Sequence, residues 1–353
     1  METVFASRGH LVASLRAMSY FQDSAAMSDA QSGITYYDYL KKFEADFDDM
    51  YYDFKHKAVE LVLMIFRPEN LFVHVTGRED LYQEAELTLP VFEATLAAGD
   101  LVMSQRALAN AGGADATFLD VNALFKKLHT LRNPSGKGAS YDLYHGELPN
   151  EGMKTAAQIQ YVCRAGDFRK AGYPYTGAMS ILKVILGYDY FWLNVRVKGG
   201  AYGCMSNFSR DGAAYFVTYR DPNLENSVEI FDKTPDYLRD FDADERDMTK
   251  YIIGTISGMD APLTPSQQGL RDLRMYIEGT SFDTIQTIRD QVLNATVEDI
   301  QALAEPIQKM LSQGVICVVG NEGKIEDAKD LFHTVRALTE LQNYRITELQ
   351  NKE

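Results

Sequence analysis

Two side chains suited to holding a developing negative charge lie six residues apart near the middle of the chain. Arg196 offers a planar, permanently charged guanidinium, and Tyr202 offers a phenol hydroxyl. Either group can donate a hydrogen bond to an oxyanion or to a peptide carbonyl. Glycines around the tyrosine permit close backbone approach or positive φ values, although an ordinary loop could have the same sequence. We therefore expect a ligand or another chain to approach here, with binding backbone at Gly199, Gly200 and Ala201.

The cysteines indicate neither a disulfide framework nor a metal site. They form an odd, widely spaced set that lacks the paired spacing of a zinc knuckle. A free cysteine usually packs as a small buried hydrophobe. We therefore predict three reduced, structural thiols at Cys163, Cys204 and Cys317.

The composition is that of an ordinary folded protein with room for two domains. The chain has 353 residues, of which 46% are hydrophobic and 24% charged. Its net charge of −15 argues against a nucleic-acid partner, since such partners require clustered Lys and Arg. The sequence contains no apolar run of about 20 residues that would indicate a membrane span, and residues 61–66 are interpreted as a buried strand. No signal peptide follows Met1, which carries little weight if the chain is a fragment. A cytoplasmic location is the default expectation.

A pattern of strand, glycine and helix occurs twice. Residues 71–77 lead into an acidic helix start, and so do residues 315–320. A second parallel pairs an expected strand at residues 13–17 with a helix at 36–43, matching residues 215–219 and 237–241. The segment between these copies, residues 132–150, is rich in turn-forming residues and predicts a connector. If both halves are copies of one domain, the first copy begins in its middle.

Individual elements of the second half can also be predicted. Residues 176–186 are expected to be helical, and helices are expected to begin at Thr234 and Thr296, where N-cap residues precede proline or acidic residues. Strands are expected near Val195 and at residues 214–219 and 315–319. The sequence contains no Gly-x-Gly-x-x-Gly motif of the kind found in dinucleotide-binding folds. These patterns favour an α+β sandwich with a mostly antiparallel sheet.

Several sequence blocks in register resemble the insulinase/pitrilysin superfamily of zinc metallopeptidases, in its presequence-protease-like branch. Most are similar to the last domain of those proteases, and one is similar to the third domain. The resemblance covers most of the chain and is weakest between residues 101 and 150. The blocks of the last domain are residues 195–203, 208–212, 219–223, 262–265 and 318–320, and that of the third domain is residues 7–11.

The resemblance implies a C-terminal half of such a protease, built from two related metallopeptidase-type α/β sandwich units. Residues 1–131 would be a partial third domain with trailing helices, and residues 151–353 the fourth domain. Family proteins enclose unfolded peptides in a chamber made of two halves. The implied partners are an unfolded peptide substrate and the N-terminal half, with no nucleic acid and no membrane.

The resemblance also implies where the chemistry resides. In such proteases an inverted His-x-x-Glu-His motif in the N-terminal half binds zinc. None of the six histidines here has Glu-His at that offset, so we expect no metal ligand in this chain: His10, His56, His74, His129, His145 and His333. By motif position, Arg196 and Tyr202 would act across the chamber as catalytic residues. Without the other half, the chain is expected not to cleave peptides.

Three alternative interpretations remain open at this stage. The chain could be a non-catalytic subunit that serves a separate zinc-bearing partner. It could be a purely structural homologue, although the presence of both Arg196 and Tyr202 argues mildly against that. It could also be an unrelated α+β binding module.

Overall fold

The computed structural model describes residues 2–110 and 149–338 of the chain and divides it into two compact units. The sheet unit comprises Met1–Asp38, Tyr141–Ala261 and Phe282–Glu353. The helical unit comprises Tyr39–Ser140 and Pro262–Ser281. The expected connector lies almost entirely outside the described residues. The domain division at residues 1–131, 132–150 and 151–353 therefore stays a prediction.

A single six-stranded sheet forms the centre of the sheet unit, with the strand order β3-β4-β2-β5-β1-β6. The strands from β3 to β5 in this order are antiparallel, while β1 runs parallel to β5 and β6. The predicted α+β class with a mostly antiparallel sheet is confirmed. The strands are β1 (Glu151–Thr155), β2 (Gln160–Asp167), β3 (Gly203–Phe208), β4 (Ala213–Tyr219), β5 (Val315–Asn321) and β6 (Thr334–Ala337).

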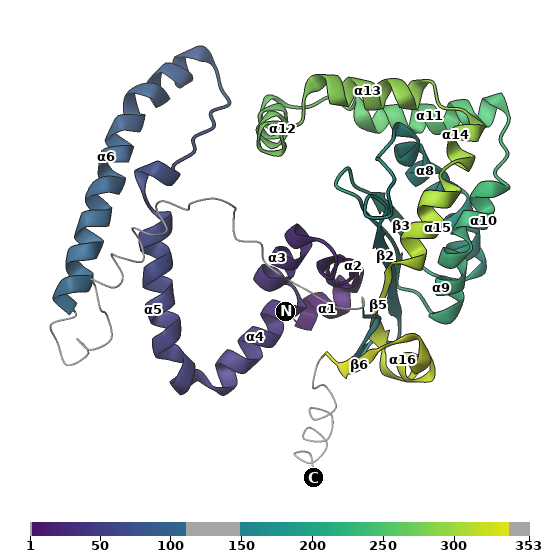
Figure 1. The fold of residues 1–353 in the computed structure, drawn as a ribbon, viewed down its shortest axis with the longest axis horizontal. Helices are drawn as coiled ribbons and strands as arrows, with labels where there is room; N and C mark the ends of the chain where they lie inside the picture. Colours follow the sequence, from purple (N-terminus) through teal and green to yellow (C-terminus); the bar gives the residue numbers. More distant parts are fainter. Residues whose placement is uncertain (1, 111–148, 339–353) are drawn as a thin grey trace, which may run out of the picture. The chain divides into compact units, whose positions relative to one another are not determined.

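Helices cover both faces of this sheet (Figure 1). One face carries α1 (Glu2–Ser7), α2 (Gly9–Ser19) and α3 (Asp23–Ser32), with α2 packed directly on β2 and β5. The other face carries the helices of the second half. These are α8 (Gly177–Tyr188), α9 (Glu225–Asp232), α10 (Thr234–Arg239), α11 (Glu245–Met259), α13 (Phe282–Leu293), α14 (Val297–Gln301), α15 (Ala304–Ser312) and α16 (Glu322–Asp327), with the short 3-10 turn η3 (Lys329–Leu331).

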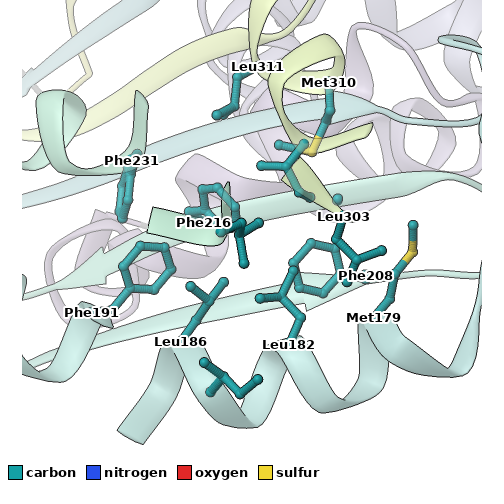
Figure 2. Close-up of a cluster of buried hydrophobic side chains, with 14 of the residues drawn as sticks. Met179, Leu182, Leu186, Phe191, Phe208, Phe216, Phe231, Leu303, Met310 and Leu311 are labelled. Atoms are coloured by element: carbon teal, nitrogen blue, oxygen red, sulfur yellow. The ribbon is translucent and has the colours of Figure 1, made fainter. Parts of the chain in front are cut away.

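The alternation of side chains along the strands builds two cores. In β5, Ile316 and Val318 face the core shared with α8 and α15, whereas Cys317 and Val319 face the core shared with α2. Figure 2 shows the first of these cores, where Leu182 of α8 lies close to aromatic side chains of the sheet face. Because β4 and β5 are buried on both faces, they have nearly continuous apolar sequences. That is why the strands at residues 214–219 and 315–319 were predictable.

Capping residues explain several of the confirmed helix starts. Thr176 lies at the N-cap of α8, as expected. Thr296 caps α14 through a capping box with Asp299, in which each side chain accepts from the other residue's backbone. α10 begins at Thr234 with a proline in its first turn, as expected, but its N-cap residue is Lys233 and not the predicted Thr234. Asn321 caps α16, so the strand-to-glycine-to-helix junction after β5 is confirmed.

The helical unit contains four helices in its described part, and the first of them begins in the sheet unit. They are α4 (Ile34–Ala45), α5 (Phe47–Ile65), α6 (Glu79–Asn110) and α12 (Pro265–Glu278), with the short 3-10 turn η1 (Pro68–Asn70). The helices expected at residues 36–43 and after Gly77 are confirmed by α4 and α6. Among the described residues of the chain, no helix is both long and apolar enough to cross a membrane.

The prediction of three strands in the first third of the chain is wrong. Residues 13–17 lie in α2, where Ala13 and Ala17 are one helical turn apart and pack against the sheet. Residues 61–66 form the end of α5, and residues 71–75 form no strand. Short apolar runs do not distinguish a strand from a helix, and here two of the three belong to helices and the third to a segment without regular structure. The described part of residues 2–110 therefore contains no strand that would repeat the sheet.

Candidate functional site

The backbone around the predicted site is a π-helical segment, η2 (Trp192–Lys198), so the strand expected near Val195 is wrong. The buried Val195 side chain anchors this segment in the core. A Cβ at position 199 would lie 2.5 Å from the Val195 carbonyl oxygen, which excludes any side chain there. Gly200 has φ 78, in the left-handed region that favours glycine. The two glycines thus end the segment and turn the chain toward Tyr202.

Arg196 and Tyr202 lie beside each other on an exposed face. The Arg196 guanidinium carbon is 4.2 Å from the Trp192 ring centroid and 5.8 Å from that of Tyr202. The Tyr202 side chain is 66% exposed. Neither the guanidinium nor the Tyr202 hydroxyl has a hydrogen-bond partner among the described residues. The structure therefore leaves both donors available to a ligand.

The backbone at positions 199–201 is largely engaged within the loop. The Gly200 and Ala201 amides donate to the carbonyls of Arg196 and Val195, at 2.9 and 3.1 Å. The Gly199 carbonyl accepts a bond from Asn223, and Ala201 is buried. These amides are not free to hold an oxyanion. The substrate-binding role of Gly199, Gly200 and Ala201 stays a prediction, and their visible effect is to shape the loop.

An aromatic row continues from Tyr202 across the sheet edge. The ring centroids of Tyr202 and Tyr219 are 5.7 Å apart. Tyr219 also contacts Tyr161, at 5.7 Å, and His10, at 4.9 Å. Burial, assisted by the Arg8 charge, lowers the pKa of His10 below its usual 6.5, so this imidazole is neutral at pH 7. Its buried Nδ1 has no hydrogen-bond partner within the described part of the chain.

The turn after β4, which directly follows Tyr219, is held by several hydrogen bonds. Tyr202 donates its amide to the Arg220 carbonyl, at 3.3 Å. Asp221 is fully buried and exchanges two backbone hydrogen bonds with Gln160, at 2.8 and 2.9 Å. The Asp221 carboxylate accepts bonds from the Ser227 hydroxyl and the Asn223 amide. Burial raises the pKa of Asp221 to about 6, although these bonds oppose the shift.

Several residues of this site were not identified from the sequence. Trp192 lies four positions before Arg196, which is a usual spacing for a side-chain contact in a helix, but the expected strand concealed it. Tyr219 and Arg220 belong to a block that carried the family resemblance without an assigned role. His10 and Tyr161 are distant in sequence and meet only because α2 packs on β2. No local pattern could have joined them.

Among the described residues, neither the cysteines nor the potential metal ligands form a second candidate site. All three cysteines are free, as predicted; Cys163 and Cys317 are buried and Cys204 is half-buried. Burial raises the pKa of each thiol, so the reactive thiolate form is suppressed. Within residues 2–110 and 149–338, no group of three or more His, Cys, Asp or Glu side chains is arranged to hold a metal ion.

The sheet covered by helices defines an α+β domain, and an exposed arginine–tyrosine pair lies at the edge of this sheet. The sequence profile of the PreP C-terminal domain matches residues 150–322. The chain belongs to the insulinase superfamily and represents C-terminal sequence of its presequence-protease branch.

Individual relatives agree with this assignment. Protein HypA of Clostridium perfringens is 34% identical over 340 residues, which is 96% of this chain. Presequence protease 1, chloroplastic/mitochondrial, of Arabidopsis thaliana is 27% identical over 333 residues, or 94% of this chain. The chain spans only 31% and 27% of the length of these two relatives.

Comparison with solved structures gives low TM-scores. A peptidase M16 inactive domain from Pseudomonas fluorescens is 19% identical, with a TM-score of 0.40, and the match covers 57% of this chain and 50% of that one. Pitrilysin is 14% identical, with a TM-score of 0.39, covering 85% of this chain and 33% of that one. Because both TM-scores lie below 0.5, the family assignment rests on the sequence matches.

Proposed function

We propose that this chain supplies the substrate-binding and oxyanion-stabilising side chains of a zinc-dependent metalloendopeptidase that degrades unfolded oligopeptides in an enclosed chamber. The observation that carries the proposal is the exposed pair of Arg196 and Tyr202, whose donors have no hydrogen-bond partner among the described residues. Relatives named presequence proteases support a peptidase function for the protein to which this sequence belongs.

The geometry suggests a separate role for each of the two side chains. The Tyr202 hydroxyl donates to the scissile carbonyl oxygen and the bond strengthens as negative charge develops there. Stacking on Trp192 holds the Arg196 guanidinium beside the phenol. Its planar fork can then bind a neighbouring peptide carbonyl or share the developing charge. The tight loop behind the pair keeps both groups in place before substrate arrives.

The described residues do not fit a zinc ion, because no suitable cluster of ligands is present among them. We therefore assign the zinc ligands and the glutamate base to the N-terminal half of the protease, the proposed partner of this chain. Zinc in that half would supply the activated water. The contribution of this chain is confined to binding, orienting and stabilising charge on the peptide.

The test combines this chain with a zinc-bearing half, fused or separate, and follows cleavage of an unstructured peptide. Tyr202→Phe removes only a hydroxyl, so kcat should fall about 10²- to 10³-fold while KM changes little. Arg196→Lys should also reduce kcat/KM, because an ammonium lacks the planar pair of donors. Tyr188→Phe is the matched control, since Tyr188 is an exposed tyrosine at the end of α8.

Two results would contradict the proposal. One is a stably folded Tyr202→Phe enzyme with near-normal kcat, which would mean that the hydroxyl does not act on the substrate. The other is chelator-sensitive turnover by the isolated chain with added zinc, surviving removal of trace host proteases. If the variants instead lose activity in proportion to thermal stability, the pair merely braces the loop.

A further inference from the structure

Arg220 adopts a strained backbone conformation at the end of β4. Its φ of 50 makes it the one non-glycine residue with positive φ in the described part of the chain. Such a conformation costs roughly 1–3 kcal/mol and persists where the surroundings enforce it. Here β4 holds the preceding residue, and the buried Asp221 holds the following one through its two backbone bonds to Gln160.

The side chain of this strained residue is held on an aromatic surface. The Arg220 guanidinium carbon lies 5.5 Å from the Tyr219 ring centroid, and the guanidinium is hydrogen-bonded to the Tyr161 side chain. Arg220 is nevertheless exposed and forms no ion pair with any described carboxylate, in a chain whose acidic residues outnumber its basic ones by 15. Because a guanidinium has five N–H donors, most of them remain available.

Arg220 is also tied to the proposed catalytic pair. A second row is formed by Arg196, Tyr202, Tyr219 and Arg220. The Arg196 guanidinium carbon is 5.8 Å from the Tyr202 ring centroid, the two tyrosine centroids are 5.7 Å apart, and the Arg220 guanidinium carbon is 5.5 Å from the Tyr219 centroid. The row has a cation at each end and two aromatic rings between them. It is no longer than about five residues of an extended peptide, at 3.3–3.6 Å per residue.

We propose that Arg220 is a specificity-determining residue that binds a carboxylate of the peptide substrate, a few residues away from the bond on which Tyr202 acts. The carboxylate comes either from an Asp or Glu side chain or from the peptide's C-terminus. A planar guanidinium with free parallel donors favours this group, which it can bind through two hydrogen bonds. The proposal rests on the proposed function, because it requires the peptide to lie along the row.

The sole tryptophan of the chain provides a local probe. Trp192 is in contact with Arg196 at one end of the row, so its fluorescence should respond to a peptide bound there. The chain is titrated to millimolar concentration with three unstructured peptides that lack Trp. The first has one Asp and an amidated C-terminus, the second has Asn and a free C-terminal carboxylate, and the third has Asn and an amidated C-terminus.

In the wild-type chain, one carboxylate-bearing peptide should bind about tenfold more tightly than the neutral peptide, and the peptide that does so identifies the source of the carboxylate. Arg220→Gln should abolish this preference while leaving binding of the neutral peptide unchanged. Arg196→Gln should weaken all three peptides alike. Arg246→Gln, which removes an exposed charge on α11, is the control for net charge and should change nothing.

A second variant separates binding from folding. Arg220→Gly relieves the positive φ, so its melting temperature should be equal to or above that of the wild type, yet the preference for a carboxylate should disappear. A lower melting temperature in Arg220→Gly would show that the arginine serves the fold. Equal binding of all three peptides, or a preference that survives Arg220→Gln, would overturn the Arg220 proposal alone. Failure of every peptide to bind at millimolar concentration would overturn the Arg220 proposal, whereas the proposed function is tested separately by cleavage in the presence of the zinc-bearing half.

Discussion

The two units of the chain differ in how they bury their apolar side chains. The sheet unit has a core on each face of its sheet, with large side chains that are fully buried. In the helical unit, Met275 is the one large apolar side chain that is buried among its described residues. Many others are exposed: Phe54, Leu61, Ile65, Phe66, Phe72, Leu87, Val91, Phe92, Leu270, Tyr276 and Ile277.

This difference indicates where stability is located. Burial of apolar surface is the main favourable term in folding, at about 25 cal/mol per Å². Among the described residues, the helices of the helical unit therefore gain little stability from burial, while the sheet unit has packing that opposes unfolding. The site residues belong to the sheet unit, where rigid elements hold them in place.

The largest expected effect comes from removing a core aromatic of the sheet unit. Phe216 is fully buried and contacts Phe191 and Phe231, with ring centroids 5.1 and 5.6 Å away. Phe216→Ala should lower the free energy of unfolding by about 3–5 kcal/mol. Phe92→Ala in α6, where the side chain is 51% exposed, should change it by less than about 0.5 kcal/mol.

Denaturant unfolding of both variants measures this contrast. Equal losses would contradict it, because they would mean that α6 is packed as tightly as the sheet. Hydrogen exchange gives a second check, since amides of β2 and β5 should exchange far more slowly than those of α5.

A smaller effect is expected from the ion network that joins α2 to the sheet. Glu151 of β1 accepts bonds from Arg16 at 2.8 Å, from Tyr20 at 2.7 Å and from Arg336 at 3.2 Å. Glu151→Gln would remove a negative charge that pairs with the largely buried Arg16. It should therefore destabilise the sheet unit by about 3 kcal/mol at pH 7.

The pH dependence tests the same network. Burial alone would raise the pKa of Glu151, but the attraction of Arg16 and the bonds from Arg16, Tyr20 and Arg336 lower it below the usual 4.5. A depressed pKa gives stability that is present above pH 4.5 and lost as pH falls through the folded value. The wild type should therefore approach Glu151→Gln in stability at acid pH in urea melts. A constant gap down to pH 2 would argue against this charge network.

The regions that sequence reasoning predicted well are those with strong local signals. Continuous apolar runs identified β4 and β5, the turn before Thr176 identified the start of α8, and the capping pattern at Thr296 identified that of α14. The apolar runs at residues 61–66 and 71–75 misled, because the first is the end of a long helix and the second forms neither a helix nor a strand. The apparent duplication relied on strands expected at residues 13–17 and 71–77, and the structure gives it no support among the described residues.

The site was predictable only in part, for a similar reason. Arg196 and Tyr202 are chemically distinctive and lie close in sequence, so a resemblance sufficed to single them out. The surface on which they lie depends on contacts between α2, β2 and β4, including those of His10 with Tyr161 and Tyr219. Such non-local contacts and the strain at Arg220 arise from tertiary packing, which no sequence period records.

The smallest expected effect concerns Asp221 and has the opposite pH dependence to that of Glu151. Its folded pKa of about 6 exceeds the usual 3.8 because of burial, so the stability it permits is fully present below pH 3.8 and is lost as pH rises through 6. Asp221→Asn removes this penalty but loses one accepted hydrogen bond, so the gain at pH 7 should be about 2 kcal/mol, with little or no gain at pH 3.5. Urea melts of Asp221→Asn and of the wild type between pH 3.5 and 7.5 measure this difference in stability. If Asp221→Asn is instead destabilising at pH 7, the charged carboxylate is needed to hold the turn that carries Arg220, and the sheet unit owes part of its stability to a buried charge.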